Sequence, residues 1–190
     1  LFKSRTILQN ESPKQQRSLE ELPKAEELYK RLKAGVANLI AKHSAEEVHL
    51  VGIYSGGAWL AERLKEDLVL TTSNALINTS LYRDDFRKIG LHGQKQPTSV
   101  PFDVSDKHLI LVDDILYTGR SVRAAMNELF DIGRPASIAL AVLLDRGGRE
   151  LPIQADVVGE VFELPNTQRF VLSQNEESIF DMSLKEVEDA

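Results

Sequence analysis

Two adjacent carboxylates followed by a short polar turn are the strongest chemical signal in this chain. Asp113 and Asp114 come directly after the apolar run 109–112 (LILV), and a Tyr-Thr-Gly-Arg-Ser segment occupies 117–121. A turn of this kind at a helix start can direct backbone N–H groups, the helix N-terminus and two hydroxyls at one phosphate. Neighbouring carboxylates can accept hydrogen bonds from two vicinal hydroxyls, as on a ribose. An N-capping turn behind two solvated aspartates is the structural alternative, but the combination favours a binding site.

Two other segments carry residues suited to the same ligand. Ser55, Gly56 and Gly57 follow the apolar run 48–54 (VHLVGIY), and Arg146 follows the apolar run 138–144. A glycine pair permits close backbone approach to an anion, although it also suits a plain turn. Ligands of an open parallel sheet bind at the carboxyl ends of its strands. If these runs are parallel strands, all three segments meet at one edge.

The elements that would position these residues alternate along the chain. Strands are predicted at 48–54, 75–82, 108–112 and 138–144, with short edge strands at 156–161 and 170–172. Helices are predicted at 25–42, 58–68 and 120–132, where apolar residues recur at helical spacing and Gly133 follows the last helix. Apolar strands alternating with helices are typical of an α/β fold with a parallel sheet covered on both faces.

Length and composition limit the class of protein. The chain has 190 residues, 42% of them hydrophobic, a net charge of -6 and no cysteine. This predicts one packed domain at 24–190 behind a loose arm at 1–23, and it excludes disulfides and a thiolate nucleophile. From Glu150 onward, 10 acidic residues face only Arg169 and Lys185, which predicts a solvated acidic tail. The longest apolar run is too short to span a bilayer, so we expect a cytoplasmic protein.

The stretch 109–121 (LILVDDILYTGRS) resembles the phosphoribosyl-pyrophosphate (PRPP) signature of type I phosphoribosyltransferases. With the segments at 81–85, 133–135, 145–147 and 149–153, the chain is similar to the PyrR family, bifunctional pyrimidine-operon attenuators and uracil phosphoribosyltransferases. The resemblance runs from about 48 to 159. It implies a type I phosphoribosyltransferase fold, with a central parallel sheet flanked by helices and a small C-terminal hood from about 150. It also implies a flexible flap that begins at Arg83, and we expect residues 87–100 to be mobile without ligand.

The resemblance also implies a reaction and its residues. Uracil and PRPP would give UMP and pyrophosphate, with Mg²⁺ held by substrate oxygens near Asp113 and Asp114 rather than in a dedicated protein site. The implied catalytic residues are Asp113, Asp114 and Arg83, the last at the start of the flap. The implied contacts to PRPP and UMP are Ser55, Gly56, Gly57, Arg83, Asp113, Asp114, Ile115, Leu116, Tyr117, Thr118, Gly119, Arg120, Ser121, Arg146 and Val158.

One residue bears on the base. Tyr117 stands where many purine-salvage relatives carry an acidic residue, and a tyrosine cannot take the carboxylate's role toward a purine N7 at neutral pH. This favours a pyrimidine.

Two other functions remain open. The first is a UMP-sensing, RNA-binding attenuator with little turnover, and the second is a phosphoribosyltransferase for another base. Gly148 replaces a histidine common in the family, and the acidic tail follows the altered hood, so we expect RNA affinity to be generic. The body before Glu150 could still present a basic patch from Arg120, Arg123, Arg134 and Arg149 to a pyrimidine-leader RNA. We also expect a homo-oligomer.

Overall fold

A parallel sheet forms the centre of the protein. The computed structural model describes residues 23–79 and 97–187. Its five-stranded sheet has the order β2-β1-β3-β4-β5, and each neighbouring pair is parallel. The strands are β1 (Val48–Ile53), β2 (Ala75–Ile77), β3 (His108–Leu116), β4 (Ser137–Asp145) and β5 (Val157–Val161). The predicted fold class is therefore confirmed.

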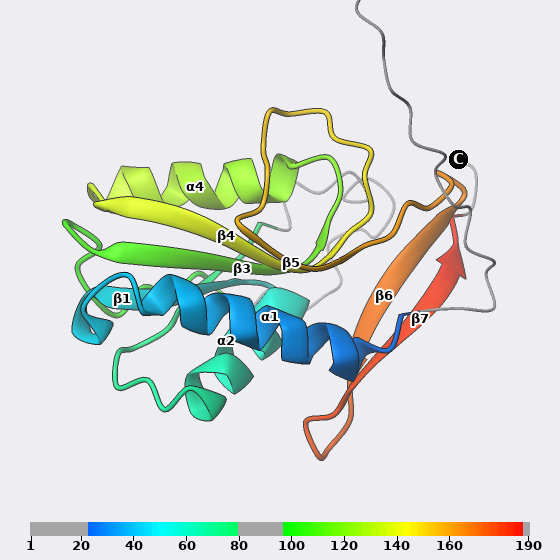
Figure 1. Ribbon diagram of the computed structural model, residues 1–190. Helices are drawn as coiled ribbons and strands as arrows, with labels where there is room; N and C mark the ends of the chain where they lie inside the picture. Colours follow the sequence, from blue (N-terminus) through cyan, green and yellow to red (C-terminus); the bar gives the residue numbers. More distant parts are fainter. Residues whose placement is uncertain (1–22, 80–96, 188–190) are drawn as a thin grey trace, which may run out of the picture.

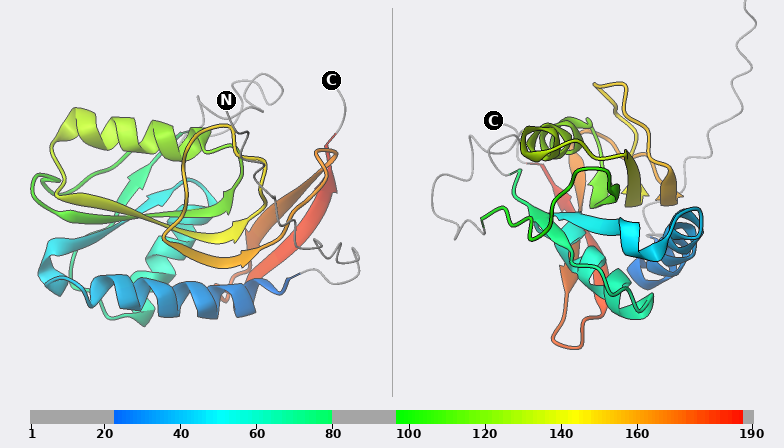
Figure 2. Two further views of the ribbon diagram at one scale, coloured as in Figure 1. Left: turned by 45° about the horizontal axis from the view of Figure 1, so that its top comes forward. Right: turned by 90° about the vertical axis from the view of Figure 1, so that its left-hand side faces the viewer.

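Helices cover both faces of this sheet (Figures 1 and 2). One face carries α1 (Ala25–Ile40) and α2 (Gly56–Asp67), and the other carries α4 (Arg120–Ile132); a 3-10 turn at Ala45–Glu47 precedes β1. Alternate residues of each central strand serve the two cores, so that Val112 packs toward α1 and α2 while Leu111 packs toward α4. Burial on both faces explains why these strands are continuous apolar runs. In the described part of the chain, no helix is long and apolar enough to cross a membrane.

Strand β3 is longer than the sequence pattern predicted. It was expected to end at Val112, but its backbone continues to pair with β4 as far as Leu116 opposite Asp145. The ladder uses only backbone N–H and C=O groups, so polar side chains do not interrupt it while a partner strand runs alongside. Both aspartates therefore lie on a rigid strand rather than in a turn.

A separate hairpin follows the sheet. Strands β6 (Gln168–Gln174) and β7 (Phe180–Glu186) pair antiparallel in a two-stranded sheet of their own, beside the end at which β3 and β4 finish (Figure 1). The expected edge strand at 170–172 is thus part of this hairpin. The prediction of a solvated acidic tail is also corrected, because residues 180–186 form strand β7. The hairpin forms because alternate side chains on its two strands are apolar and are buried on one face. These buried residues are Phe170, Leu172, Phe180 and Met182.

A charged contact joins the hairpin to two helices. Arg63 of α2 donates to both carboxylate oxygens of Glu26 of α1, at 2.6 and 2.9 Å, and the Phe180 N–H donates to the same carboxylate at 2.8 Å. The Arg63 guanidinium lies 4.2 Å from the ring centre of Tyr29 and 4.9 Å from that of Phe180. The hydrogen bond from Arg63 holds the pKa of Glu26 below its ordinary value. We call these four residues the hairpin anchor.

Candidate active site

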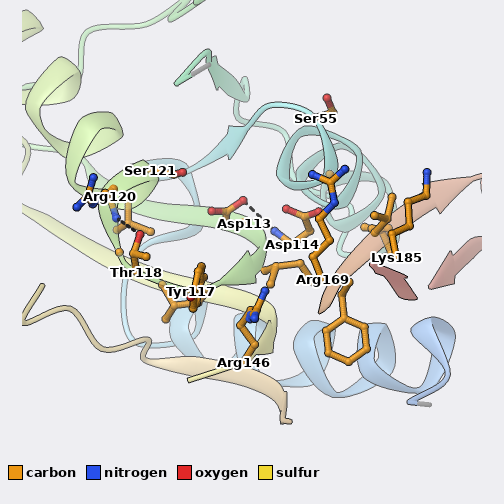
Figure 3. A pocket seen from close by; sticks show the side chains of 18 of the residues that line it. Ser55, Asp113, Asp114, Tyr117, Thr118, Arg120, Ser121, Arg146, Arg169 and Lys185 are labelled. Atoms are coloured by element: carbon orange, nitrogen blue, oxygen red, sulfur yellow. Dashed lines mark hydrogen bonds between the residues drawn. The ribbon is translucent and has the colours of Figure 1, made fainter. Parts of the chain in front are cut away.

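A cavity of about 620 Å³ opens where β1, β3 and β4 end and the hairpin begins (Figure 3). Three segments that the sequence analysis singled out line it together, as the parallel-sheet argument predicted. The predicted site residues found on its wall are Ser55, Gly56, Asp113, Asp114, Ile115, Leu116, Tyr117, Thr118, Gly119, Arg120, Ser121 and Arg146.

The turn before α4 is built to receive an anion. Gly119 is the N-cap of α4 and has φ +90°, a left-handed conformation that favours glycine. The Arg120 N–H donates to the Thr118 hydroxyl at 3.3 Å, and the Thr118 carbonyl accepts N–H groups from Glu150 and Leu151 at 3.1 and 3.2 Å. The turn is thus fixed from outside, and the N-terminus of a thirteen-residue helix faces the cavity.

The two carboxylates reach the cavity from opposite faces of β3. Successive strand residues alternate, so Asp113 lies on the α4 side and Asp114 on the α2 side. Asp113 is 3% exposed, and its carboxylate accepts the Asp114 N–H at 3.0 Å. Asp114 packs so close to the start of α2 that a Cβ on Gly56 would lie 2.5 Å from its Oδ2 atom. The carboxylates are therefore held apart in fixed positions, as two hydrogen-bond acceptors for one ligand must be.

Tyr117 and Arg146 form a stack on the other side of the cavity. The Arg146 guanidinium lies 4.1 Å from the Tyr117 ring centre and donates from Nη2 to the Pro165 carbonyl at 3.2 Å. The Tyr117 hydroxyl donates to Asn166 Oδ1 at 3.1 Å. Arg146 is 7% exposed, which lowers its pKa from the ordinary value, and its buried Nε finds no acceptor among the described residues. A buried, unpaired donor on a cavity wall is suited to a ligand carbonyl.

Gly148 belongs to this stack. It has φ +67°, and a Cβ at this position would overlap the edge of the Tyr117 ring. At the position where the resemblance implied a histidine, the Tyr117 ring in this chain occupies the space that a side chain would need.

Two predicted site residues, Gly57 and Val158, do not line the cavity. Gly57 packs against β3, where a Cβ would overlap the Val112 carbonyl oxygen. Val158 sits within β5, opposite Val142, and packs in the core beneath α4. Arg83 and most of the predicted flap lie outside the described residues, as does the predicted N-terminal arm except residue 23.

The hairpin adds residues that sequence reasoning missed. Arg169 and Lys185 of the hairpin line the cavity, as do Trp59 of α2 and Asn166, which precedes β6. The two cations are cross-strand partners in the hairpin. One feature of the sequence could have pointed to them: they are the only basic residues after Glu150.

The predicted basic patch is partly neutralised. Arg120 pairs with Glu150 at 2.6 Å. Arg149 is half-buried and donates to the Asp145 carboxylate and to the carbonyls of Tyr117 and Ile153. These two arginines brace the turn that holds Thr118, so only part of their charge remains for another partner.

Comparisons with known proteins agree on one group. The phosphoribosyl transferase domain family matches residues 21–174. The "Bifunctional protein PyrR" of Nitrosococcus oceani is 53% identical over 144 residues, 74% of this chain and 81% of that protein. Its namesake in Ralstonia nicotianae is 50% identical over 153 residues, 80% of this chain and 87% of that protein.

Solved structures show the same fold at lower identity. A hypoxanthine-guanine phosphoribosyltransferase from Bacillus anthracis superposes with a TM-score of 0.59 at 20% identity, covering 74% of this chain and 82% of that one. A hypoxanthine phosphoribosyltransferase from Staphylococcus aureus gives 0.58 at 21% identity, covering 74% and 75%. At these identities the likeness concerns the fold alone.

Proposed function

The chain belongs to the phosphoribosyl transferase domain family and, within it, to the PyrR proteins, and we propose that it transfers the phosphoribosyl group of PRPP to uracil, giving UMP and pyrophosphate. The observation that carries the proposal is the meeting of the anion-binding turn, both aspartates and the Tyr117–Arg146 stack in one cavity.

Each part of PRPP has a complementary wall. The 5′-phosphate suits the turn at Thr118 and Gly119, where backbone N–H groups and the α4 dipole favour negative charge. The ribose hydroxyls suit Asp113 and Asp114, which lie directly ahead of that turn. With the phosphate and ribose placed in this way, the pyrophosphate would lie near Ser55 and Gly56 at the start of α2, where a glycine allows close backbone approach.

The base site is best supported on the side of Arg146. A uracil carbonyl can accept from the buried Arg146 Nε, which has no acceptor among the described residues. The Tyr117 ring closes this side, with its hydroxyl tied to Asn166. No carboxylate stands at position 117 to serve a purine N7, which favours a pyrimidine that reacts through N1.

In the transfer itself, the protein mainly positions the reacting groups and stabilises the charge that develops. The C1–O bond to pyrophosphate breaks and its electron pair leaves with the pyrophosphate. The uracil N1 bonds to C1 and gives up its proton to water or to the departing pyrophosphate. Positive charge on the ribose during this exchange is stabilised by fixed carboxylates in a partly enclosed site.

Mg²⁺ fits this site as a substrate-bound ion. Among residues 23–79 and 97–187, no three His, Cys, Asp or Glu side chains cluster as metal ligands. A hard cation that keeps several water ligands can instead be held by pyrophosphate and ribose oxygens, with Asp113 and Asp114 accepting from its waters. Bound there, Mg²⁺ would offset the negative charge of pyrophosphate as it leaves.

A radiolabelled base-transfer assay with PRPP and Mg²⁺ tests the proposal. Uracil should give labelled UMP, while cytosine, hypoxanthine and guanine should react far more slowly. Asp113→Asn and Asp114→Asn should each lower turnover strongly without lowering the melting temperature much. Asp131→Asn, an exposed aspartate in the last turn of α4, is the matched control. Near-normal turnover in both active-site variants would refute the ribose assignment, and transfer to a purine instead would refute the base.

An RNA-binding regulator is the second candidate. The word bifunctional in the relatives' printed name is compatible with a second function beside base transfer. The internal pairing of Arg120 and Arg149 in this chain works against a strong phosphate-binding patch. We therefore expect weak RNA affinity that falls steeply with salt and does not depend on sequence. A gel shift with a pyrimidine-leader hairpin and an unrelated RNA, each with and without UMP, tests this. Selective binding enhanced by UMP would make regulation a principal function.

A further inference from the structure

This inference rests on the proposed function, in which the end of the cavity at α2 holds pyrophosphate. The negative charges of pyrophosphate would be repelled there by carboxylates of the same cavity. Ser55, Gly56 and the start of α2 offer N–H groups and a helix dipole but no charged side chain. Asp113 and Asp114 line the same cavity with carboxylates. A pyrophosphate carries several negative charges, and repulsion from carboxylates in a partly enclosed site is substantial. Mg²⁺ bound to the pyrophosphate would offset part of this charge, and cationic side chains on the cavity wall can offset more of it.

The described residues offer four cations on the cavity wall: Arg120, Arg146, Arg169 and Lys185. Arg120 stands beside the phosphate turn and pairs with Glu150 at 2.6 Å. Arg146 is buried beneath the Tyr117 ring, on the base side. The other two cations, Arg169 and Lys185, are both on the hairpin.

Their geometry suits that role. Arg169 and Lys185 stand directly opposite each other across the hairpin, and strand alternation places them on the face away from Phe170 and Phe180. Arg169 extends from β6 toward Asp114 and Ser55 (Figure 3). Lys185 lies further out on β7 in the same view. Both are exposed, so neither charge is weakened by burial.

The hairpin is also held firmly enough to present them. Phe170, Leu172 and Phe180 are each no more than 7% exposed, and the hairpin anchor ties Phe180 to α1 and α2. The start of α2 carries Ser55 and Gly56 at its N-terminal side. The two walls of the proposed subsite are therefore joined through one helix.

We propose that Arg169 and Lys185 form the cationic wall of the pyrophosphate subsite. Arg169 provides a planar fork of donors for phosphate oxygens, and Lys185 provides a point charge at the rim. Their charge stabilises the electron pair that pyrophosphate takes from the C1–O bond. The C-terminal hairpin is thereby assigned to the leaving group as well as to the cover of the cavity.

Binding of two ligands to the whole protein tests this directly. Pyrophosphate with Mg²⁺ and UMP are titrated separately into Arg169→Gln, Lys185→Gln and Arg169→Lys by calorimetry. Arg169→Gln should weaken pyrophosphate binding about tenfold or more, and Lys185→Gln about threefold, as expected for lost charge-assisted contacts at an inner and an outer position. UMP binding should stay within about twofold because UMP lacks the pyrophosphate. Arg169→Lys should recover part of the loss.

Lys65→Gln is the control for net charge, since Lys65 lies in the last turn of α2 and does not line this cavity. Circular dichroism and melting temperature check that the hairpin still folds. Equal weakening of both ligands, or a lower melting temperature with unchanged pyrophosphate affinity, would overturn the assignment.

The two proposals fail separately. If Arg169→Gln weakens pyrophosphate binding as expected but the wild-type protein makes no UMP, the proposed function alone is refuted. A wild-type protein that makes UMP, with variants that bind pyrophosphate normally, would refute the subsite alone.

Discussion

Glu26→Gln should loosen the hairpin that carries Arg169 and Lys185. The Glu26 carboxylate accepts two hydrogen bonds from Arg63 and one from the Phe180 N–H, and so links α1, α2 and β7. Glutamine has the same shape and can still accept from Phe180. The substitution therefore removes the charge of the hairpin anchor with little change in packing.

The size of the effect follows from the exposure of the pair. Hydrogen bonds to charged groups contribute about 1.5–3 kcal/mol when well shielded. The side chains of Glu26 and Arg63 are 32% and 23% exposed, so solvent screens part of this energy. Breaking the pair should lower the free energy of unfolding by about 1–2 kcal/mol.

The pH dependence gives the sharper test. The Arg63 hydrogen bond lowers the pKa of Glu26 in the folded state from its ordinary value of 4.5. A lowered folded-state pKa means that the carboxylate stabilises the fold above pH 4.5, and that this contribution is lost as the pH falls toward the folded-state pKa. The difference in stability between wild type and Glu26→Gln should therefore be full at neutral pH and shrink in acid.

Urea unfolding at neutral and acid pH measures this difference. Trp59, the single tryptophan, lies one helical turn before Arg63 on α2 and reports locally by fluorescence. Glu66→Gln, an exposed position on the same helix, is the control and should leave the transition midpoint nearly unchanged. A difference between wild type and Glu26→Gln that is the same at both pH values would refute the reasoning.

Three further substitutions test other parts of the structure. Val69 has φ +53° and is 83% exposed, so Val69→Gly should raise the free energy of unfolding by about 1 kcal/mol, seen as a higher urea midpoint. Gly57→Ala should lower that free energy by about 2 kcal/mol, because the new Cβ would overlap the Val112 carbonyl oxygen; an unchanged midpoint would contradict this. Asn166→Ala removes the hydrogen-bond acceptor of the Tyr117 hydroxyl and should raise KM for uracil about threefold while leaving KM for PRPP unchanged.

The sequence by itself determined the kind of each central element and much of the site. The apolar run before Asp113 indicated a buried strand, and the structure contains one there. Gly119 and Gly133 stand at the two ends of the helix Arg120–Ile132. These are local signals, since they depend on side-chain periodicity and on backbone angles that few residues adopt. The parallel topology then required the strand ends to converge, which brought Ser55 and Arg146 to the same cavity as the aspartates.

Only the tertiary structure decided which residues complete that cavity. Local sequence gave no reason for β3 to continue through Asp113 and Asp114, because the cause is backbone pairing with β4. Local sequence likewise indicated an acidic tail after Glu150. In the structure, β7 pairs there with β6 and brings Arg169 and Lys185 to the site. Strand pairing joins residues that are distant in sequence through backbone groups common to all residues. Charge composition therefore did not reveal it, and side-chain alternation became decisive only once a core was present to bury one face.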